Sequence, residues 1–131
     1  MLIDVTRPEM IAAAAETVAQ IVEGGSLLAG LVNNAGIVVT GPLELVSLDQ
    51  WRRQFEVNLF GQVAVTQALL PLLRKSRGRI VNVSSISGIL APPFMAPYAA
   101  SKHALEAISE ALRMEVRHWG ISVSLVEPAS V

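Results

Sequence analysis

The sequence predicts an α/β fold in which short parallel strands alternate with long helices. Four segments of four to six residues have the apolar content or the alternation of strands, and three segments with apolar residues at helical spacing separate them. Each helical segment is long enough for a right-handed crossover between parallel strands. The expected order is therefore β-α-β-α-β-α-β, a doubly wound arrangement with a mostly parallel sheet.

The first half of this pattern has clear boundaries. Residues 2–5 form a brief apolar run, and we expect a strand there. Pro8 suits the first turn of a helix, which the apolar spacing extends over residues 8–23 until Gly24 and Gly25 end it. Residues 27–32 are apolar almost without interruption, so we expect a strand that is buried on both faces.

The second half contains two longer helices. Ser47 with Gln50 three residues later predicts a capping box for a helix over residues 48–74. Residues 79–84 form the next expected strand. Pro97 begins a helix that continues to about residue 119, where Gly120 is placed for a left-handed cap. Residues 121–126 form the last expected strand.

Composition limits the function classes. The length of 131 residues suggests one domain over residues 1–131. Its residues are 52% apolar and 16% charged, with a mean hydropathy of +0.50, which suggests strands buried on both faces or an apolar interface with another copy. A net charge of −1 gives no electrostatic case for nucleic acid or an anionic membrane. There are no cysteines, no membrane-length apolar run and no visible signal peptide, so we expect a cytoplasmic protein.

Three residues form a candidate catalytic group. Tyr98 and Lys102 are four residues apart, so on a helix they lie on one face. A phenol beside an ammonium group suits general acid–base chemistry on a carbonyl or an alcohol. Ser85 returns to the same place if the intervening loop doubles back. His103 and His118 are fifteen residues apart without nearby acidic partners, so we expect no metal site.

The spacing Ser-x12-Tyr-x3-Lys resembles the catalytic signature of the short-chain dehydrogenases/reductases. Further stretches resemble the same family in the expected order: Asp4-Val5, Asn33-Asn34-Ala35-Gly36, Asn58 within Val57-Asn58-Leu59-Phe60-Gly61, and the segment from Gly78 to Ser85. The resemblance covers nearly the whole chain and implies a partial Rossmann-like fold.

The resemblance also implies a role for each matching residue. Asn58 would hold a water in a proton relay, Ser85 would bind the substrate oxygen, and Tyr98 would be the acid or base. Lys102 would favour the phenolate and donate to the cofactor ribose. The implied NAD(P) site contains Asp4, Asn34, Ala35, Gly36, Tyr98 and Lys102.

The chain departs from the family pattern at both ends. The family's Thr-Gly-x3-Gly-x-Gly turn, which brings backbone amides to the cofactor pyrophosphate, has no match, so the implied cofactor site is incomplete. Pro128-Ala129 stands where the family has Pro-Gly, and the segment that forms the substrate lid is missing. The strand over residues 2–5 would therefore pair elsewhere, swap into a partner or stay loose.

Three functions follow from these observations. The first is NAD(P)-dependent reduction of a ketone or oxidation of a secondary alcohol, on a small-molecule substrate. The second is a cofactor-free serine hydrolase, with Ser85 as nucleophile and Tyr98 or Lys102 as its base. The third is an inactive remnant that dimerises. The two long helices, over residues 48–74 and 97–119, correspond to the family's dimer helices, so we expect a homodimer or a higher homo-oligomer. The sequence leaves the substrate and the choice between NAD and NADP open.

Overall fold

The sheet has three parallel strands in the order β1-β2-β3. The computed structural model describes residues 1–129, and its strands are β1 (Gly30–Asn33), β2 (Arg79–Val83) and β3 (Ser122–Val126). In the register of the sheet, Ile80 of β2 lies opposite Leu31 of β1 and Val123 of β3. The expected parallel α/β architecture is confirmed.

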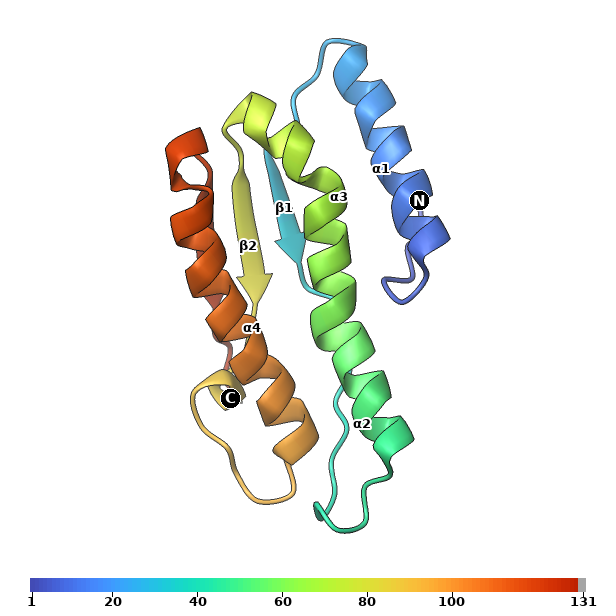
Figure 1. The fold of residues 1–131 in the computed structure, drawn as a ribbon, viewed down its shortest axis with the longest axis vertical. Helices are drawn as coiled ribbons and strands as arrows, with labels where there is room; N and C mark the ends of the chain where they lie inside the picture. Colours follow the sequence, from blue (N-terminus) through green and yellow to red (C-terminus); the bar gives the residue numbers. More distant parts are fainter. Residues whose placement is uncertain (130–131) are drawn as a thin grey trace.

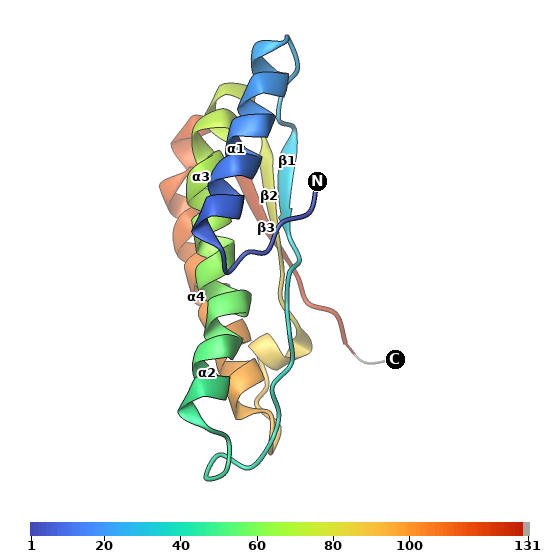
Figure 2. The ribbon, with the colours of Figure 1, turned by 90° about the vertical axis from the view of Figure 1, so that its right-hand side faces the viewer.

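The helices all lie on one side of this sheet (Figure 2). In chain order they are α1 (Pro8–Glu23), α2 (Leu48–Phe55), the π-helix η1 (Glu56–Phe60), α3 (Gly61–Ser76), the 3₁₀ turn η2 (Ile86–Gly88), α4 (Ala96–Glu115) and the 3₁₀ turn η3 (Arg117–Trp119). Figure 1 shows α4, α3 and α1 side by side across the sheet. The described part of the chain is therefore a two-layer structure.

The core lies between the sheet and the helices α3 and α4. Its buried apolar side chains come from both layers and are Leu73, Ile80, Val116, Ile121 and Val123. Alternation along the strands explains this choice, because every second residue faces the helices. In β3, for example, Val123 is buried while Ser122 and Ser124 are exposed.

The predicted helix ends agree closely with the structure. The Ser47 side chain accepts a hydrogen bond from the Gln50 amide, and the Gln50 side chain accepts one from the Ser47 amide, so the capping box is confirmed. Gly120 adopts the left-handed conformation, with φ of 72°, as expected. The preceding helix is shorter than expected, because α4 ends at Glu115 and the chain continues as η3.

The expected strand over residues 2–5 is wrong. No strand is assigned before β1 in the described residues, and residues 1–4 are exposed. The Asp4 carboxylate accepts hydrogen bonds from the amide and the hydroxyl of Thr6, at 2.9 Å and 2.7 Å. This local turn competes with an extended conformation, and no neighbouring strand offers the segment a ladder.

The expected strand over residues 27–32 is shorter and later in the chain, because β1 covers only Gly30–Asn33. Burial on both faces is also wrong, since the Val32 side chain is 63% exposed. The face of the sheet opposite the helices is uncovered in the described residues (Figure 2). An apolar run shows that a strand has apolar side chains, but it does not show which segment covers them.

The expected helix over residues 48–74 is helical throughout, but it contains a change of geometry and ends at Ser76. Five residues, Glu56–Phe60, form a π-helix between α2 and α3. Such segments are rare and occur frequently at functional sites. None of the described helices is long and apolar enough to cross a membrane.

Candidate active site

The candidate site is a cleft at the carboxyl ends of the strands. Its volume is about 470 Å³. The residues that line it include Asn34, Gly36, Ser85, Met95, Tyr98 and Lys102. In parallel sheets, loops at the carboxyl ends of the strands form the usual ligand site.

Ser85 is the second residue after β2 and the N-cap of η2. Its Oγ accepts a hydrogen bond from the Ser87 amide at 3.1 Å, so the hydroxyl also caps this short turn. The next amide, that of Ile86, donates to the Pro128 carbonyl at 3.0 Å. Ser85 is therefore held between the ends of β2 and β3, where one side of the serine borders the cleft.

Tyr98 and Lys102 lie one turn apart near the start of α4, as the spacing predicts. The Lys102 Nζ is 5.8 Å from the centre of the Tyr98 ring. It also donates a hydrogen bond to the Val83 carbonyl at 2.7 Å, which fixes the lysine between α4 and the end of β2. Both side chains line the same cleft as Ser85.

Burial controls the charge of Lys102. Its side chain is only 4% exposed, and loss of hydration lowers the pKa of its ammonium below 10.5. The negative charge of Glu106, one turn further along α4, opposes this effect and raises the pKa of Lys102. The site therefore contains a lysine whose protonation depends on its neighbours.

Asn58 is fully buried at the centre of the π-helix. Its Oδ1 accepts a hydrogen bond from the Ile37 amide at 2.8 Å, and its Nδ2 donates to the Ile37 carbonyl at 3.0 Å. Nδ2 also donates to the Ser101 Oγ at 3.2 Å, and Ser101 in turn donates to the Tyr98 carbonyl. Asn58 thus joins η1 to the loop after β1 and to the turn that carries Tyr98.

Two further amides hold the same loop, and the sequence analysis missed both. Gln54 exchanges hydrogen bonds with the Val39 amide and the Ile37 carbonyl, at 2.7 Å and 2.8 Å. Gln62 donates to the Ala35 carbonyl at 2.8 Å. With Asn58 they form a series spaced four residues apart. Side-chain amides that recur every fourth residue lie on one helix face, and this spacing is the sequence signal that predicts a shared set of polar contacts.

The structure places some of the expected cofactor residues at the cleft and others away from it. Asn34 and Gly36 line the cleft, and a side chain on Gly36 would lie 3.6 Å from the Asn58 Oδ1 and 3.9 Å from the Lys102 Nζ. Ala35 is adjacent and exposed, while its carbonyl is bound by Gln62. Asp4 is exposed, bonded to Thr6, and is not among the residues that line the cleft.

The loop before α4 forms one rim of the cleft. Met95 lines the cleft, whereas Phe94 is exposed and has a left-handed backbone, with φ of 65°. The Phe94 carbonyl accepts a hydrogen bond from the Gly41 amide at 2.8 Å, which ties this loop to the one after β1. A left-handed conformation is uncommon for a phenylalanine and persists where the surroundings hold it.

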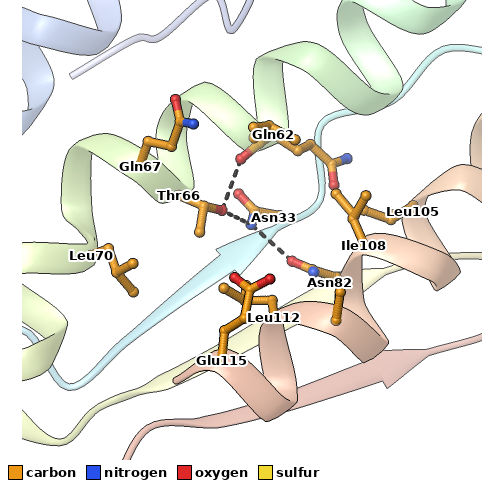
Figure 3. Close-up of a pocket in the computed structure, with 12 residues that line it drawn as sticks. Asn33, Gln62, Thr66, Gln67, Leu70, Asn82, Leu105, Ile108, Leu112 and Glu115 are labelled. Carbon is orange, nitrogen blue, oxygen red and sulfur yellow. Dashed lines mark hydrogen bonds between the residues drawn. The ribbon is translucent and has the colours of Figure 1, made fainter. Parts of the chain in front are cut away.

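A second cavity, of about 320 Å³, lies between α3 and α4 (Figure 3). A buried network crosses its floor, in which Asn33 donates to Thr66 and to the Asn82 Oδ1, at 2.9 Å and 2.8 Å. Asn82 donates onward to the Ser109 Oγ at 2.8 Å. This network joins β1, β2, α3 and α4, in agreement with a structural rather than catalytic role for Asn33.

The geometry agrees with the comparison to known proteins. Residues 1–131 match the family model for short chain dehydrogenases. An uncharacterized oxidoreductase of Escherichia coli K12, YbbO, is 46% identical over 132 residues, which cover all of this chain and 48% of the relative. The chain thus spans about half the length of the curated relatives it matches.

Solved structures give the same result. A short-chain dehydrogenase from Streptomyces avermitilis matches with a TM-score of 0.90 and 38% identity, over 99% of this chain and 47% of the other. An NAD⁺-bound xylitol dehydrogenase matches with a TM-score of 0.88 and 30% identity, over 98% of this chain and 49% of the other. The chain belongs to the short-chain dehydrogenase family.

Proposed function

We propose that the protein catalyses NAD(P)-dependent reduction of a ketone or oxidation of a secondary alcohol. One observation carries the proposal: Ser85, Tyr98 and Lys102 line a single cleft at the carboxyl ends of parallel strands. The substrate is a small molecule whose reacting carbon lies against this cleft. The bound nicotinamide supplies or accepts the hydride.

Tyr98 is the proposed proton donor in reduction and the proton acceptor in oxidation. Its phenol is half-buried at the cleft, and Lys102 lies close by in the next turn of α4. An ammonium close to the phenol stabilises the negative charge that develops on its oxygen as the proton passes to the alkoxide. Ser85 would donate a hydrogen bond to the same substrate oxygen and orient it toward Tyr98.

Asn58 and Lys102 support this proton transfer. Asn58 holds the loop after β1 against the turn of α4 through Ile37 and Ser101. We assign it, with Lys102, to the path by which the Tyr98 proton is exchanged with solvent. Its position in a π-helix is in agreement with a functional role.

The residues of the cleft fit the nicotinamide and ribose part of the cofactor. Gly36 borders Lys102, because a Cβ at this position would be in van der Waals contact with the Lys102 Nζ and the Asn58 Oδ1. Lys102 uses one ammonium hydrogen on Val83 and has two more for ribose hydroxyls. Asn34, Ala35 and Gly36 would form the adjoining wall, while Asp4 would act nearer the adenine. The 131 residues contain no glycine-rich turn for the pyrophosphate.

The proposal is tested by cofactor binding and by turnover. We expect calorimetry to detect NADH or NADPH binding, and a panel of ketones and secondary alcohols to give nicotinamide absorbance changes. Tyr98→Phe should keep cofactor binding while turnover falls by roughly 100-fold or more, because the general acid is lost. Ser85→Ala should also lower turnover, because the hydrogen bond to the substrate oxygen is lost. Its matched control is Ser87→Ala, which changes a neighbouring serine in η2. Full turnover by Tyr98→Phe, or no binding of either nicotinamide, would refute the proposal.

The hydrolase alternative receives no comparable support. Within residues 1–129 no hydrogen bond joins the Ser85 Oγ to Tyr98 or Lys102, and Lys102 is engaged with Val83. Hydrolysis of a short-chain p-nitrophenyl ester is therefore the control reaction. Ester turnover that Ser85→Ala abolishes, without nicotinamide binding, would favour the hydrolase.

We also propose that two copies associate through α3 and α4. The cavity between these helices has an apolar wall formed by Val63, Leu70, Ile108 and Leu112 (Figure 3 shows the last three). Sedimentation velocity gives the mass in solution. Gln67→Arg, at the rim of this cavity, should weaken a dimer, and a monomeric wild-type chain would contradict it.

A further inference from the structure

A carboxylate oxygen and a hydroxyl beside the candidate site are buried without hydrogen-bond partners within residues 1–129. They are the Glu106 Oε1, on α4, and the Ser84 Oγ, at the end of β2. Neither atom has a partner among the protein groups of residues 1–129. Buried polar atoms are normally paired, so an unpaired carboxylate oxygen calls for a specific explanation.

Gly88 shows that the two groups share one space. A methyl group built on Gly88 would lie 2.6 Å from the Ser84 Oγ and 2.9 Å from the Glu106 Oε1. Both oxygens therefore border the position that a side chain at residue 88 would fill. Because the two oxygens border one small volume, a hydroxyl rotation or one bridging water would suffice to join Ser84 to the carboxylate.

Lys102 lies next to this pair. Glu106 follows it by four residues, so the two side chains project from the same face of α4. Ser84 follows Val83, whose carbonyl accepts the Lys102 hydrogen bond. The carboxylate raises the pKa of Lys102 against the effect of burial, although the two groups form no direct ion pair in the described residues.

We infer that Glu106 is a positioning residue for the reaction: its carboxylate, held by the Ser84 hydroxyl in the space left by Gly88, keeps Lys102 charged and directed at the cleft. This inference rests on the proposed function only for its catalytic consequence. Lys102 acts on Tyr98 and on the ribose as an ammonium, so a group that preserves the ammonium preserves both roles.

The other groups around Lys102 do not replace Glu106. The packed elements η2 and β3 contain no ionisable residue. The charged residues of α2 and η1 are Asp49, Arg52, Arg53 and Glu56, and all are exposed. Beyond them, α4 itself contributes Tyr98 and the exposed His103, and Glu127 follows β3 at the surface.

The composition of the chain makes a direct test simple. Lys75 and Lys102 are its two lysines, and Lys75 is exposed. In protein labelled with ¹³C-lysine, two sets of resonances report the two titrations. Glu106→Gln should move the Lys102 midpoint to lower pH, because a favourable negative charge is lost, while Lys75 stays unchanged. Glu110→Gln, one turn further along α4 at an exposed position, is the matched control and should move neither lysine.

Ser84→Ala tests the second part of the inference. It should shift the Lys102 midpoint in the same direction as Glu106→Gln but by less. An unchanged Lys102 midpoint in Glu106→Gln would overturn the inference, and an unchanged midpoint in Ser84→Ala would remove Ser84 from it.

Two more measurements keep the inference testable if a variant does not fold or if the protein shows no turnover. If Glu106→Gln does not fold, the wild-type chain can be used, because the Lys102 resonances should respond when acid protonates the neighbouring carboxylate. No response there would overturn the inference. In turnover assays, Glu106→Gln should shift the alkaline limb of the pH profile to lower pH. A wild-type protein without turnover would refute the proposed function, whereas the lysine titration would still decide the role of Glu106.

Discussion

Substitution of Asn58 by alanine should destabilise the fold as well as impair the site. The wild-type side chain makes three hydrogen bonds, to the Ile37 amide, the Ile37 carbonyl and the Ser101 hydroxyl. A buried hydrogen bond contributes roughly 0.5–1.5 kcal/mol net, and buried partners left unpaired cost more. We expect Asn58→Ala to lower the free energy of unfolding by about 2–4 kcal/mol.

Urea unfolding followed by circular dichroism measures this loss. Asn34→Ala is the matched control, because Asn34 is exposed and such a change usually costs less than about 0.5 kcal/mol. Amide hydrogen exchange adds a local readout, since the Ile37 amide should lose its protection in Asn58→Ala. If the two variants unfold at the same urea concentration, Asn58 does not hold the loop after β1 and our assignment fails.

Three further substitutions test other parts of the structure. Burial lowers the pKa of Lys102 in the folded chain below 10.5, so between the folded and unfolded pKa values the unfolded chain binds more protons and stability should increase as pH rises. Lys102→Met should remove this increase in urea unfolding measured at stepped pH. Parallel stability profiles of the wild type and the variant would contradict the role of burial. Gly61→Ala would place a methyl group 2.7 Å from the Val5 carbonyl oxygen and should lower the free energy of unfolding by roughly 1–3 kcal/mol. The Thr6 and Arg7 amides should then exchange hydrogen faster, and unchanged exchange would show that this contact is unimportant. Ser47→Ala removes the capping box of α2 and should lower the free energy of unfolding, measured by thermal unfolding, by about 1 kcal/mol. Ser26→Ala, at an exposed position, is the control and should lower it far less.

The position of the proposed catalytic group in the fold could be predicted because its information is local. Tyr98 and Lys102 share a helix face at a spacing of four residues, and the structure places both at the cleft. The place of Ser85 could be predicted because it follows a strand whose neighbours in the sheet end at the same edge. The turn signals at Ser47 and Gly120 are equally local, since each acts within a few residues of the helix end.

The main errors concern contacts between segments that are distant in the chain. Asp4 and its neighbours resemble a strand, but no partner strand lies beside them in the described residues, and Thr6 binds the Asp4 carboxylate instead. Val32 is apolar yet exposed, because apolar character shows what a residue tolerates and not what covers it. The π-helix around Asn58 follows from amide contacts with the loop after β1, which helix propensity does not describe.

The sequence by itself determined the class of this protein: alternating strand and helix periods establish the parallel α/β fold, and the spacing of Ser85, Tyr98 and Lys102 indicates the family. Only the tertiary structure decided what surrounds these residues. It places Asn58 on the backbone of Ile37, Lys102 on the carbonyl of Val83, and Glu106 beside Ser84 in the space left by Gly88. The physical reason is that periodicity is a property of one segment, whereas burial, pairing and charge compensation depend on segments that are distant in the chain.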